Sequence, residues 1–344
     1  MQSFNKKLIN WHLKHPRNLP WKATNNAYYI WLSEIILQQT RVEQGLPYYE
    51  KFVQHYPKVE DLANAPLDEV LKLWEGLGYY SRARNLHLAA QQIVADYNGK
   101  LPNSYDELLK IKGIGSYTAA AIASFAFNLP HAVVDGNVFR VLARVFGIAT
   151  PIDTTQGKKE FEALANQLLD KKQAALFNQA IMDFGAIQCV PRNPNCSICI
   201  FNDSCFAYIN NKINDLPFKS KKIKKKERYF HFVVAYNQHN IVIVQRTEQD
   251  IWQSLFQFPM LETDTSTIPS DLQAFGINEL NSFIYKQQLT HQKIIGIFYE
   301  LKTEKIDTIA KKWNAMKVNK SKINNFAFPR IINNYLKDRF IYLI

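Results

Sequence analysis

The four cysteines of this chain lie within one short segment and constrain its fold more than any other feature. Cys189, Cys196, Cys199 and Cys205 have the spacing C-x6-C-x2-C-x5-C. The N-terminus shows no apolar run followed by a small-residue cleavage site, so we expect no export and no disulfides. A site with four thiolate ligands is therefore favoured. Zinc commonly uses two short Cys knuckles and only one is present, whereas four thiolates from one loop suit an iron–sulfur cluster; zinc and unliganded thiols stay open as alternatives.

A run of lysines marks the boundary between two parts of the chain. Six Lys between residues 219 and 226 account for half of the formal net charge of +12. Such a run repels itself and attracts phosphates, which is typical of a linker near a polyanion. The 344 residues, of which 47% are hydrophobic, are enough for two globular domains. We predict a first domain over residues 1–218, a Lys-rich linker over 219–227 and a second domain over 228–344.

The spacing of the apolar residues changes at this linker. Before it, apolar positions recur at helical spacing, as in Trp31, Ile35 and Ile36, and no apolar run is long enough for a membrane span. After it, short β-rich stretches cover residues 229–236, 240–245 and 293–301. We predict an all-α first domain and an α+β second domain, so the chain as a whole is mainly α.

A Gly-x-Gly turn joins two predicted helices of the first domain. Gly113 and Gly115 follow a helix that ends near Leu109, and an Ala-rich helix begins near Ser116. Glycines at a helix start let backbone amides approach a phosphate closely, which allows a protein to grip DNA without reading its sequence. Lys112 adds a cation beside these amides. Taken alone, the turn is equally consistent with an ordinary connection between helices.

An aspartate and the cysteine loop follow this turn at characteristic separations. Asp135 lies twenty residues after Gly115 and opens another helical segment, a position at which aspartate usually serves as an N-cap. The order of turn, aspartate and four-cysteine loop resembles the helix-hairpin-helix DNA glycosylases that carry an iron–sulfur loop. This resemblance implies a six-helix barrel, an iron–sulfur cluster domain and a 4Fe–4S cluster held by the four cysteines.

Single residues separate two branches of that superfamily. The endonuclease III branch has a nucleophilic lysine two residues after the second hairpin glycine, where this chain has Tyr117. The adenine DNA glycosylases of the MutY family have a segment W-L-S-E-x-x-L-Q-Q-T, and residues 31–40 match it nearly literally. The chain therefore resembles the MutY family over residues 15–206.

The second domain resembles the Nudix-like domain with which that family reads the opposite base. Trp252 and Phe258-Pro259 match it loosely, and no Nudix catalytic box follows Pro259, so we expect binding without nucleotide hydrolysis. The loop that usually reads F-S-H is Leu289-Thr290-His291 here. The resemblance therefore assigns 8-oxoguanine recognition to Thr290 and His291, without the aromatic residue.

Two carboxyl groups in different environments suit the excision of adenine. Glu34 lies in an apolar helical segment, where burial raises the pKa, and by resemblance it protonates N7 of adenine as a general acid. Asp135, at a helix N-terminus, is expected to stay ionised and to stabilise the oxocarbenium ion. Without a lysine nucleophile we expect hydrolysis only. The resemblance also assigns Tyr117 and Asn137 to the catalytic pocket, and Arg17 and Trp21 to substrate binding.

The resemblance further assigns residues to DNA contacts. The wedge that fills the stack after base flipping is formed by Gln39, Leu77 and Tyr79. The other DNA contacts are assigned to Thr40, Lys112, Gly113 and Gly115.

The resemblance implies a monofunctional glycosylase of base excision repair that removes adenine opposite 8-oxoguanine or guanine. The alternatives are a thymine or pyrimidine mismatch glycosylase, a non-catalytic DNA-lesion scanning protein and a small-nucleotide Nudix hydrolase, which the missing box disfavours. We expect a monomer that binds duplex DNA at the bacterial nucleoid in the cytoplasm, without a membrane partner. A sliding clamp is a candidate protein partner.

Overall fold

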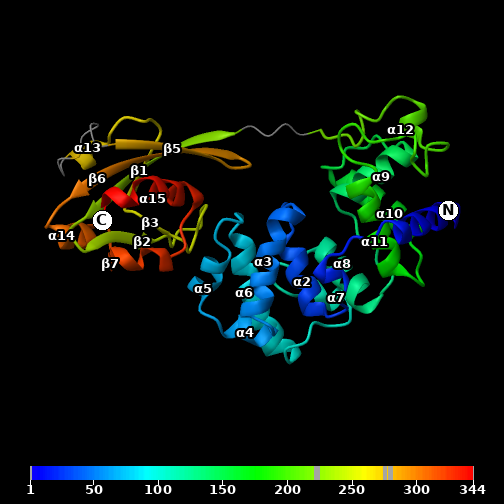
Figure 1. Ribbon diagram of the computed structural model, residues 1–344, viewed down its shortest axis with the longest axis horizontal. Helices are drawn as coiled ribbons and strands as arrows, with labels where there is room; N and C mark the ends of the chain where they lie inside the picture. Colours follow the sequence, from blue (N-terminus) through cyan, green and yellow to red (C-terminus); the bar gives the residue numbers. More distant parts are fainter. Residues whose placement is uncertain (1, 221–224, 274–276, 278–281, 344) are drawn as a thin grey trace. The chain divides into compact units, whose positions relative to one another are not determined.

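The computed structural model describes residues 2–220, 225–273, 277 and 282–343 (Figure 1). Contacts within the chain divide it into two compact units. The first unit comprises Met1–Ala63 and Leu88–Lys221, and the second comprises Asn64–His87 and Lys222–Ile344. Among the described residues, no helix is both long and apolar enough to cross a membrane.

The first unit is built of helices, which confirms the all-α prediction. Two short segments lie between the longer helices, and the helix that begins at Ser81 starts within the second unit. The elements are α1 (Gln2–Lys14), η1 (Pro20–Lys22), α2 (Ala27–Ile36), α3 (Val42–His55), α4 (Val59–Asn64), α6 (Ser81–Tyr97), α7 (Tyr105–Leu108), α8 (Ser116–Phe127), α9 (Gly136–Phe146), α10 (Thr155–Leu168), α11 (Ala174–Ile187) and α12 (Phe206–Ile209).

Side-chain caps define where the helices of the site begin. Asn26 accepts a hydrogen bond from the amide of Tyr28 at 2.9 Å and starts α2. Asp135 caps α9 in the same way. Because the first amides of a helix have no partner within it, such caps determine its first residue and thus the direction in which the following side chains point.

Apolar packing holds these helices together. Eight of the ten residues of α2 are buried, and α2 packs against α8. Helix α11 packs against α1 and α9, and a second core formed with α10 includes Phe161 and Phe184 and extends to Cys205. The cysteine loop is therefore attached to the same core that supports α9.

The second unit contains a seven-stranded mixed sheet, which confirms the α+β prediction. The strand order is β3-β2-β1-β6-β5, with β4 paired to β1 and β7 paired to β2. Strands β1 and β6 run parallel along their whole length, and β5 pairs antiparallel with β6. The strands are β1 (Lys226–Tyr236), β2 (Asn240–Gln245), β3 (Phe256–Gln257), β4 (Met260–Thr263), β5 (Ser282–Gln288), β6 (Gln292–Lys302) and β7 (Met316–Asn319).

Helices cover both faces of this sheet. On one face, Ile297 packs with Ile309 of α14 (Ile306–Lys312). On the other, Phe298 stacks on Tyr335 of α15 (Arg330–Leu343), with ring centroids 4.3 Å apart. Alternate residues of β6 thus point to opposite faces, as the period of a strand requires. The remaining short elements are α13 (Ser270–Gln273) and η3 (Lys320–Asn325).

Residues 64–87 form part of this second unit although they lie early in the chain. They include α5 (Leu67–Leu73) and the start of α6. Gln245 donates to Asp68 at 3.0 Å, and Arg84 donates to the carbonyl of Gln253 at 2.7 Å. The helical pattern of this segment does not indicate which unit it packs with. The predicted division at residues 218 and 228 stays a prediction.

Candidate active site and iron–sulfur loop

Glu34 is a buried carboxyl group near the end of α2. Only 8% of its surface is exposed, and Trp31, Leu32 and Ile35 around it are also buried. The pKa of Glu34 is raised to about 7. Burial is the largest cause of this rise, and the charge of Asp135 adds to it. The hydrogen bond from Tyr117 and the charge of Lys22 partly oppose it. A group with this pKa can hold and release a proton near neutral pH.

Tyr117 contacts this carboxyl group directly. Its hydroxyl donates a hydrogen bond of 2.8 Å to Oε2 of Glu34. Burial and the nearby charge of Glu34 hold the pKa of Tyr117 well above its ordinary value, so the phenol keeps its proton. Tyr117 is the second residue of α8, and the hairpin before this helix therefore sets the position of the hydroxyl.

Asp135 is half-buried at the start of α9. Its Oδ1 accepts from the amides of Asn137 and Val138 at 2.9 and 2.8 Å, and its Oδ2 accepts from Nδ2 of Asn137 at 2.7 Å. Burial raises the pKa of Asp135, and these hydrogen bonds together with the charge of Arg140 oppose that rise. The structure thus places Glu34, Tyr117 and Asp135 close enough for their charges to shift one another's pKa, and Asn137 joins them through its hydrogen bond to Asp135.

Arg140 connects this group to the cysteine loop. Its Nη2 donates to Oδ1 of Asn137 at 2.9 Å and to the carbonyl of Gly185 at 2.6 Å. Its Nε donates to the carbonyl of Cys189 at 2.7 Å. Arg140 was not among the predicted site residues, and its one signal in the sequence is its place one helical turn after Asn137.

Asp183 is the centre of a second charged cluster, which was not predicted from the sequence. Its side chain is 1% exposed and contacts Nζ of Lys22, Nη1 of Arg17 at 3.3 Å and Nδ1 of His12 at 3.2 Å. Although burial disfavours its charge, these partners hold the pKa of Asp183 below its ordinary value. Arg17 was predicted to bind the substrate, and the structure places it on Asp183. Trp21 is buried, with its ring 5.1 Å from that of Tyr49.

The four cysteines border a single pocket. Cys189, Cys196, Cys199 and Cys205 line it together with apolar side chains that include Phe184. The four thiols thus share one cavity. Such an arrangement fits a cluster.

A buried arginine supports this loop. Arg144 is 2% exposed, and its Nη1 lies 3.5 Å from Sγ of Cys189 and 2.8 Å from the carbonyl of Val190. It also donates to the carbonyls of Pro191 and Leu216 at 3.0 and 3.1 Å. A guanidinium beside the thiols offsets the negative charge that cysteine ligands carry. The four cysteines thus fit a 4Fe–4S cluster in both placement and charge.

The predicted hairpin forms a turn on the surface. Gly113 has a φ of +77°, which favours glycine, and a side chain added at Gly115 would meet no atom within 4 Å. Lys112, Gly113 and Gly115 are all exposed. The amide of Lys112 is bound to Gln92 at 2.9 Å, so this amide serves the fold.

The predicted wedge residues differ in exposure. Gln39 is exposed with a φ of +54°, and the Thr40 hydroxyl donates to the carbonyl of Gln38 at 3.3 Å. Leu77 is 6% exposed, whereas Tyr79 is 46% exposed with a φ of +49°. Tyr79 and Gln39 therefore present side chains at a surface, Thr40 is half-buried, and Leu77 is buried.

The lesion-reading residues lie in the turn between β5 and β6. Thr290 and His291 are both exposed, and Oγ1 of Thr290 lies 2.6 Å from the hydroxyl of Tyr79. This hydrogen bond brings together a predicted wedge residue and a predicted lesion-reading residue within the second unit. It was not predicted, because the two residues are 211 positions apart in the chain.

Three regions of the chain match known families. Residues 32–171 match the HhH-GPD superfamily of base excision DNA repair proteins, and residues 231–338 match the NUDIX domain. Residues 189–205 match the iron-sulfur binding domain of endonuclease III. This last match confirms the iron–sulfur interpretation of the cysteine loop over zinc and over unliganded thiols.

Similar proteins cover larger parts of the chain. The adenine DNA glycosylase of Buchnera aphidicola subsp. Baizongia pistaciae is 38% identical over 295 residues, 84% of this chain and 83% of that one. The adenine DNA glycosylase of Homo sapiens is 41% identical over 214 residues, 60% of this chain and 39% of that one. A solved structure of a thermostable thymine-DNA glycosylase is 31% identical, with a TM-score of 0.57 over 61% of this chain and 96% of that one.

The similarity to an adenine DNA glycosylase thus spans more than four fifths of the chain, and the match to the HhH-GPD superfamily includes Glu34. The chain belongs to the adenine DNA glycosylases of base excision repair, the MutY family of the helix-hairpin-helix superfamily.

Proposed function

We propose that this enzyme is a monofunctional glycosylase that removes adenine opposite 8-oxoguanine, and also opposite guanine, in duplex DNA. The observation that carries the proposal is the buried carboxyl group of Glu34, with its pKa of about 7 and the Tyr117 hydroxyl 2.8 Å away. A proton held there near neutral pH is what the departing base requires.

Glu34 is the general acid of the proposed reaction. Its proton moves to N7 of adenine, and the bond between N9 of adenine and C1′ of the sugar breaks with its electron pair leaving on the base. Because Glu34 is buried, the proton is not lost to bulk water before transfer. The Glu34 carboxylate that remains is stabilised by the Tyr117 hydroxyl.

Asp135 stabilises the sugar cation that this step creates. Its oxygens are held by the two amides at the start of α9 and by Asn137, so the carboxylate needs little reorganisation as positive charge develops. Water then adds at C1′, directly or after a transient ester with Asp135, its proton passes to the Glu34 carboxylate, and an abasic site remains.

Tyr117 limits the chemistry to hydrolysis. A phenol donates a hydrogen bond but has no amine with which to form an imine with the sugar. Since strand cleavage by the endonuclease III route needs such an imine, the abasic strand stays intact. The four cysteines would hold the 4Fe–4S cluster, which when bound orders the loop beneath α9; the catalytic steps above use this chain's side chains alone.

The opposite base is read in the second unit. Thr290 offers a hydroxyl and His291 an imidazole from an exposed turn, and Tyr79 lies against Thr290 at 2.6 Å. The exposed hairpin at Gly113 and Gly115 and the net charge of +12 support binding to the DNA backbone. We propose a monomer at the bacterial nucleoid, with a sliding clamp as a candidate partner.

Base release under single-turnover conditions tests this proposal. Duplexes carry adenine opposite 8-oxoguanine, guanine or thymine, and a further duplex carries thymine opposite guanine. We expect free adenine from the first two, with strand breakage only after alkali. Strand breakage without alkali would contradict the monofunctional assignment.

A thymine glycosylase is the second candidate, favoured by the 31% identity to the thermostable thymine-DNA glycosylase. It predicts thymine release from the last duplex and intact adenine in the others. Binding of all mismatches without release of any base would indicate a scanning protein.

A further inference from the structure

The turn that carries Tyr79 has an unusual backbone and depends on its flanks. Gly76, Gly78 and Tyr79 have φ values of +97°, +77° and +49°. The carbonyl of Gly78, in the middle of this turn, accepts from the indole of Trp74 at 3.0 Å and from Nη2 of Arg82 at 3.3 Å. A left-handed tyrosine is strained, so neighbouring contacts must maintain this conformation.

The residues on either side of this turn bind the backbone of a single residue of the C-terminal segment, Phe328. Before the turn, Oε1 of Glu75 accepts a hydrogen bond of 2.8 Å from the amide of Phe328. After it, the hydroxyl of Tyr80 donates to the carbonyl of Phe328 at 3.4 Å and accepts from the amide of Gly76 at 3.2 Å. Both ends of the turn are thereby attached to the backbone of Phe328.

Glu75 makes the strongest of these attachments. Its Oε1 also accepts from Nδ2 of Asn333 in α15 at 2.9 Å, and its Oε2 accepts from Nζ of Lys72 at 2.6 Å. Lys72 in turn donates to the carbonyl of Phe326 at 3.0 Å. The Glu75 side chain is 18% exposed, so these charge-assisted hydrogen bonds are partly shielded from water.

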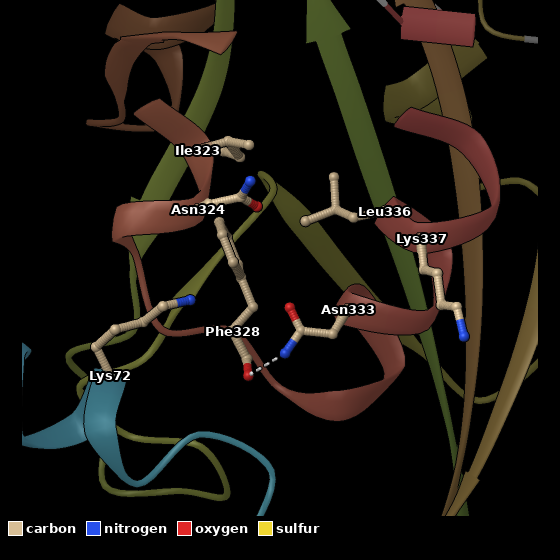
Figure 2. Close-up of a pocket in the computed structure, with 7 residues that line it drawn as sticks. All are labelled: Lys72, Ile323, Asn324, Phe328, Asn333, Leu336 and Lys337. Carbon is tan, nitrogen blue, oxygen red and sulfur yellow. Dashed lines mark hydrogen bonds between the residues drawn. The ribbon is translucent and has the colours of Figure 1, made fainter. Parts of the chain in front are cut away.

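Figure 2 shows the surroundings of this attachment. Lys72 and Asn333 approach Phe328 from different elements, and the amide of Asn333 also binds the carbonyl of Phe328 at 3.3 Å. These residues border a cavity of about 330 Å³. Because a cavity borders the contact between this turn and Phe328, apolar packing alone does not hold the two together. The polar contacts of Glu75 therefore contribute more to holding them than they would in a closely packed interface.

We propose that Glu75 is a positioning residue that determines lesion preference. It fixes the turn of residues 76–79 on the C-terminal segment, and so holds the Tyr79 hydroxyl against Thr290 in the lesion-reading turn. Tyr79 of the wedge and the lesion-reading residues Thr290 and His291 then keep fixed positions relative to one another. This inference rests on the proposed recognition of 8-oxoguanine by Thr290 and His291.

The test compares Glu75→Ala and Glu75→Gln with the control Glu69→Ala, which alters an exposed glutamate of α5. Single-turnover rates and dissociation constants are measured for adenine opposite 8-oxoguanine and opposite guanine. We expect Glu75→Ala to lower the preference for 8-oxoguanine about tenfold, the effect of losing hydrogen bonds to a charged group. Glu75→Gln keeps an acceptor for the Phe328 amide and should retain most of the preference, and Glu69→Ala should retain all of it.

A second readout does not depend on the lesion. Amide hydrogen exchange of residues 76–80 and 328 in the DNA-free protein should accelerate together in Glu75→Ala and stay slow in Glu69→Ala. Asn333→Ala, which leaves Glu75 charged and removes one of its donors, should give a smaller change in the same direction. Unchanged exchange in Glu75→Ala would overturn the proposed attachment.

The outcomes separate this inference from the proposed function. If the unsubstituted enzyme shows no preference for 8-oxoguanine, the proposed lesion recognition fails and this inference fails with it. If the preference exists and survives in Glu75→Ala, only this inference is overturned. An equal loss of rate on both substrates in Glu75→Ala would show that Glu75 supports the fold without affecting lesion preference. That result would also overturn this inference.

Discussion

The hydroxyl of Tyr117 donates a hydrogen bond of 2.8 Å to Oε2 of Glu34, across 83 residues of sequence. The donor comes from the first turn of α8 and the acceptor from the last turn of α2, two helices that pack against each other. The contact links the hairpin that is proposed to grip DNA with the proposed general acid. A shift of the hairpin would therefore alter the environment of Glu34.

Tyr117→Phe should raise the pKa of Glu34, because the lost hydrogen bond favours the charged carboxylate. A general acid with a higher pKa stays protonated to higher pH. The alkaline limb of the single-turnover rate should therefore move to higher pH, while Tyr97→Phe, an aromatic substitution in α6, leaves it in place. A move of the limb to lower pH in Tyr117→Phe would contradict this assignment.

Glu34→Gln should stabilise the fold at alkaline pH. The pKa of about 7 in the folded state lies above the ordinary 4.5, so the contribution of Glu34 is fully present below pH 4.5 and is lost as the pH rises through 7. The neutral glutamine avoids this loss, which corresponds to about 1 to 3 kcal/mol above pH 7. Urea unfolding at pH 5 and pH 8 measures the free energy of unfolding of both proteins. An increase of equal size in Glu34→Gln at both pH values would be inconsistent with ionisation of Glu34.

Asp183→Asn should destabilise the first unit strongly. The substitution leaves Lys22 and Arg17 beside a neutral amide, and removing one partner of a buried ion pair costs about 3 to 5 kcal/mol. Denaturant unfolding measures the loss. Asp203→Asn, whose carboxylate is 65% exposed in its pair with Lys7, should leave stability nearly unchanged. Equal losses of stability in the two variants would show that the buried cluster around Asp183 stabilises the fold no more than an exposed ion pair does.

Arg140→Leu should lower the rate of base release and leave DNA binding largely intact. Without the guanidinium, Asn137 loses the donor at 2.9 Å that orients it toward Asp135, and such misplacement costs roughly tenfold to hundredfold in rate. Single-turnover rates and dissociation constants separate the two effects. Arg192→Leu, an exposed arginine of the cysteine loop, serves as the control. Equal rate losses in both variants would implicate general damage to the loop.

The motifs predicted the types of residue at the site better than their contacts. The apolar surroundings of Glu34 in the segment 31–40 indicated its burial, and the position of Asp135 before a helical stretch indicated an N-cap; the structure has both. The spacing of the cysteines favoured a cluster, which the family match confirms. These features depend on neighbours in the chain, so the sequence alone contains them.

Contacts between distant segments could not be predicted in the same way. The pairing of Lys22 with Asp183 and of Glu75 with Phe328 joins residues 161 and 253 positions apart. Only the packing of segments that are separate in the chain determines such pairs. The burial of Leu77 and the placement of residues 64–87 in the second unit have the same origin, because a helical pattern does not specify which neighbour covers a face.

The central claim is that Glu34 supplies the proton for adenine release. The most direct test is the single-turnover rate of adenine release opposite 8-oxoguanine as a function of pH, in the unsubstituted enzyme and in Glu34→Gln. If Glu34 supplies the proton, the rate falls as the pH rises through about 7, and Glu34→Gln lowers it at least about a hundredfold with DNA binding retained. A Glu34→Gln variant that releases adenine at the original rate would show that Glu34 does not supply the proton.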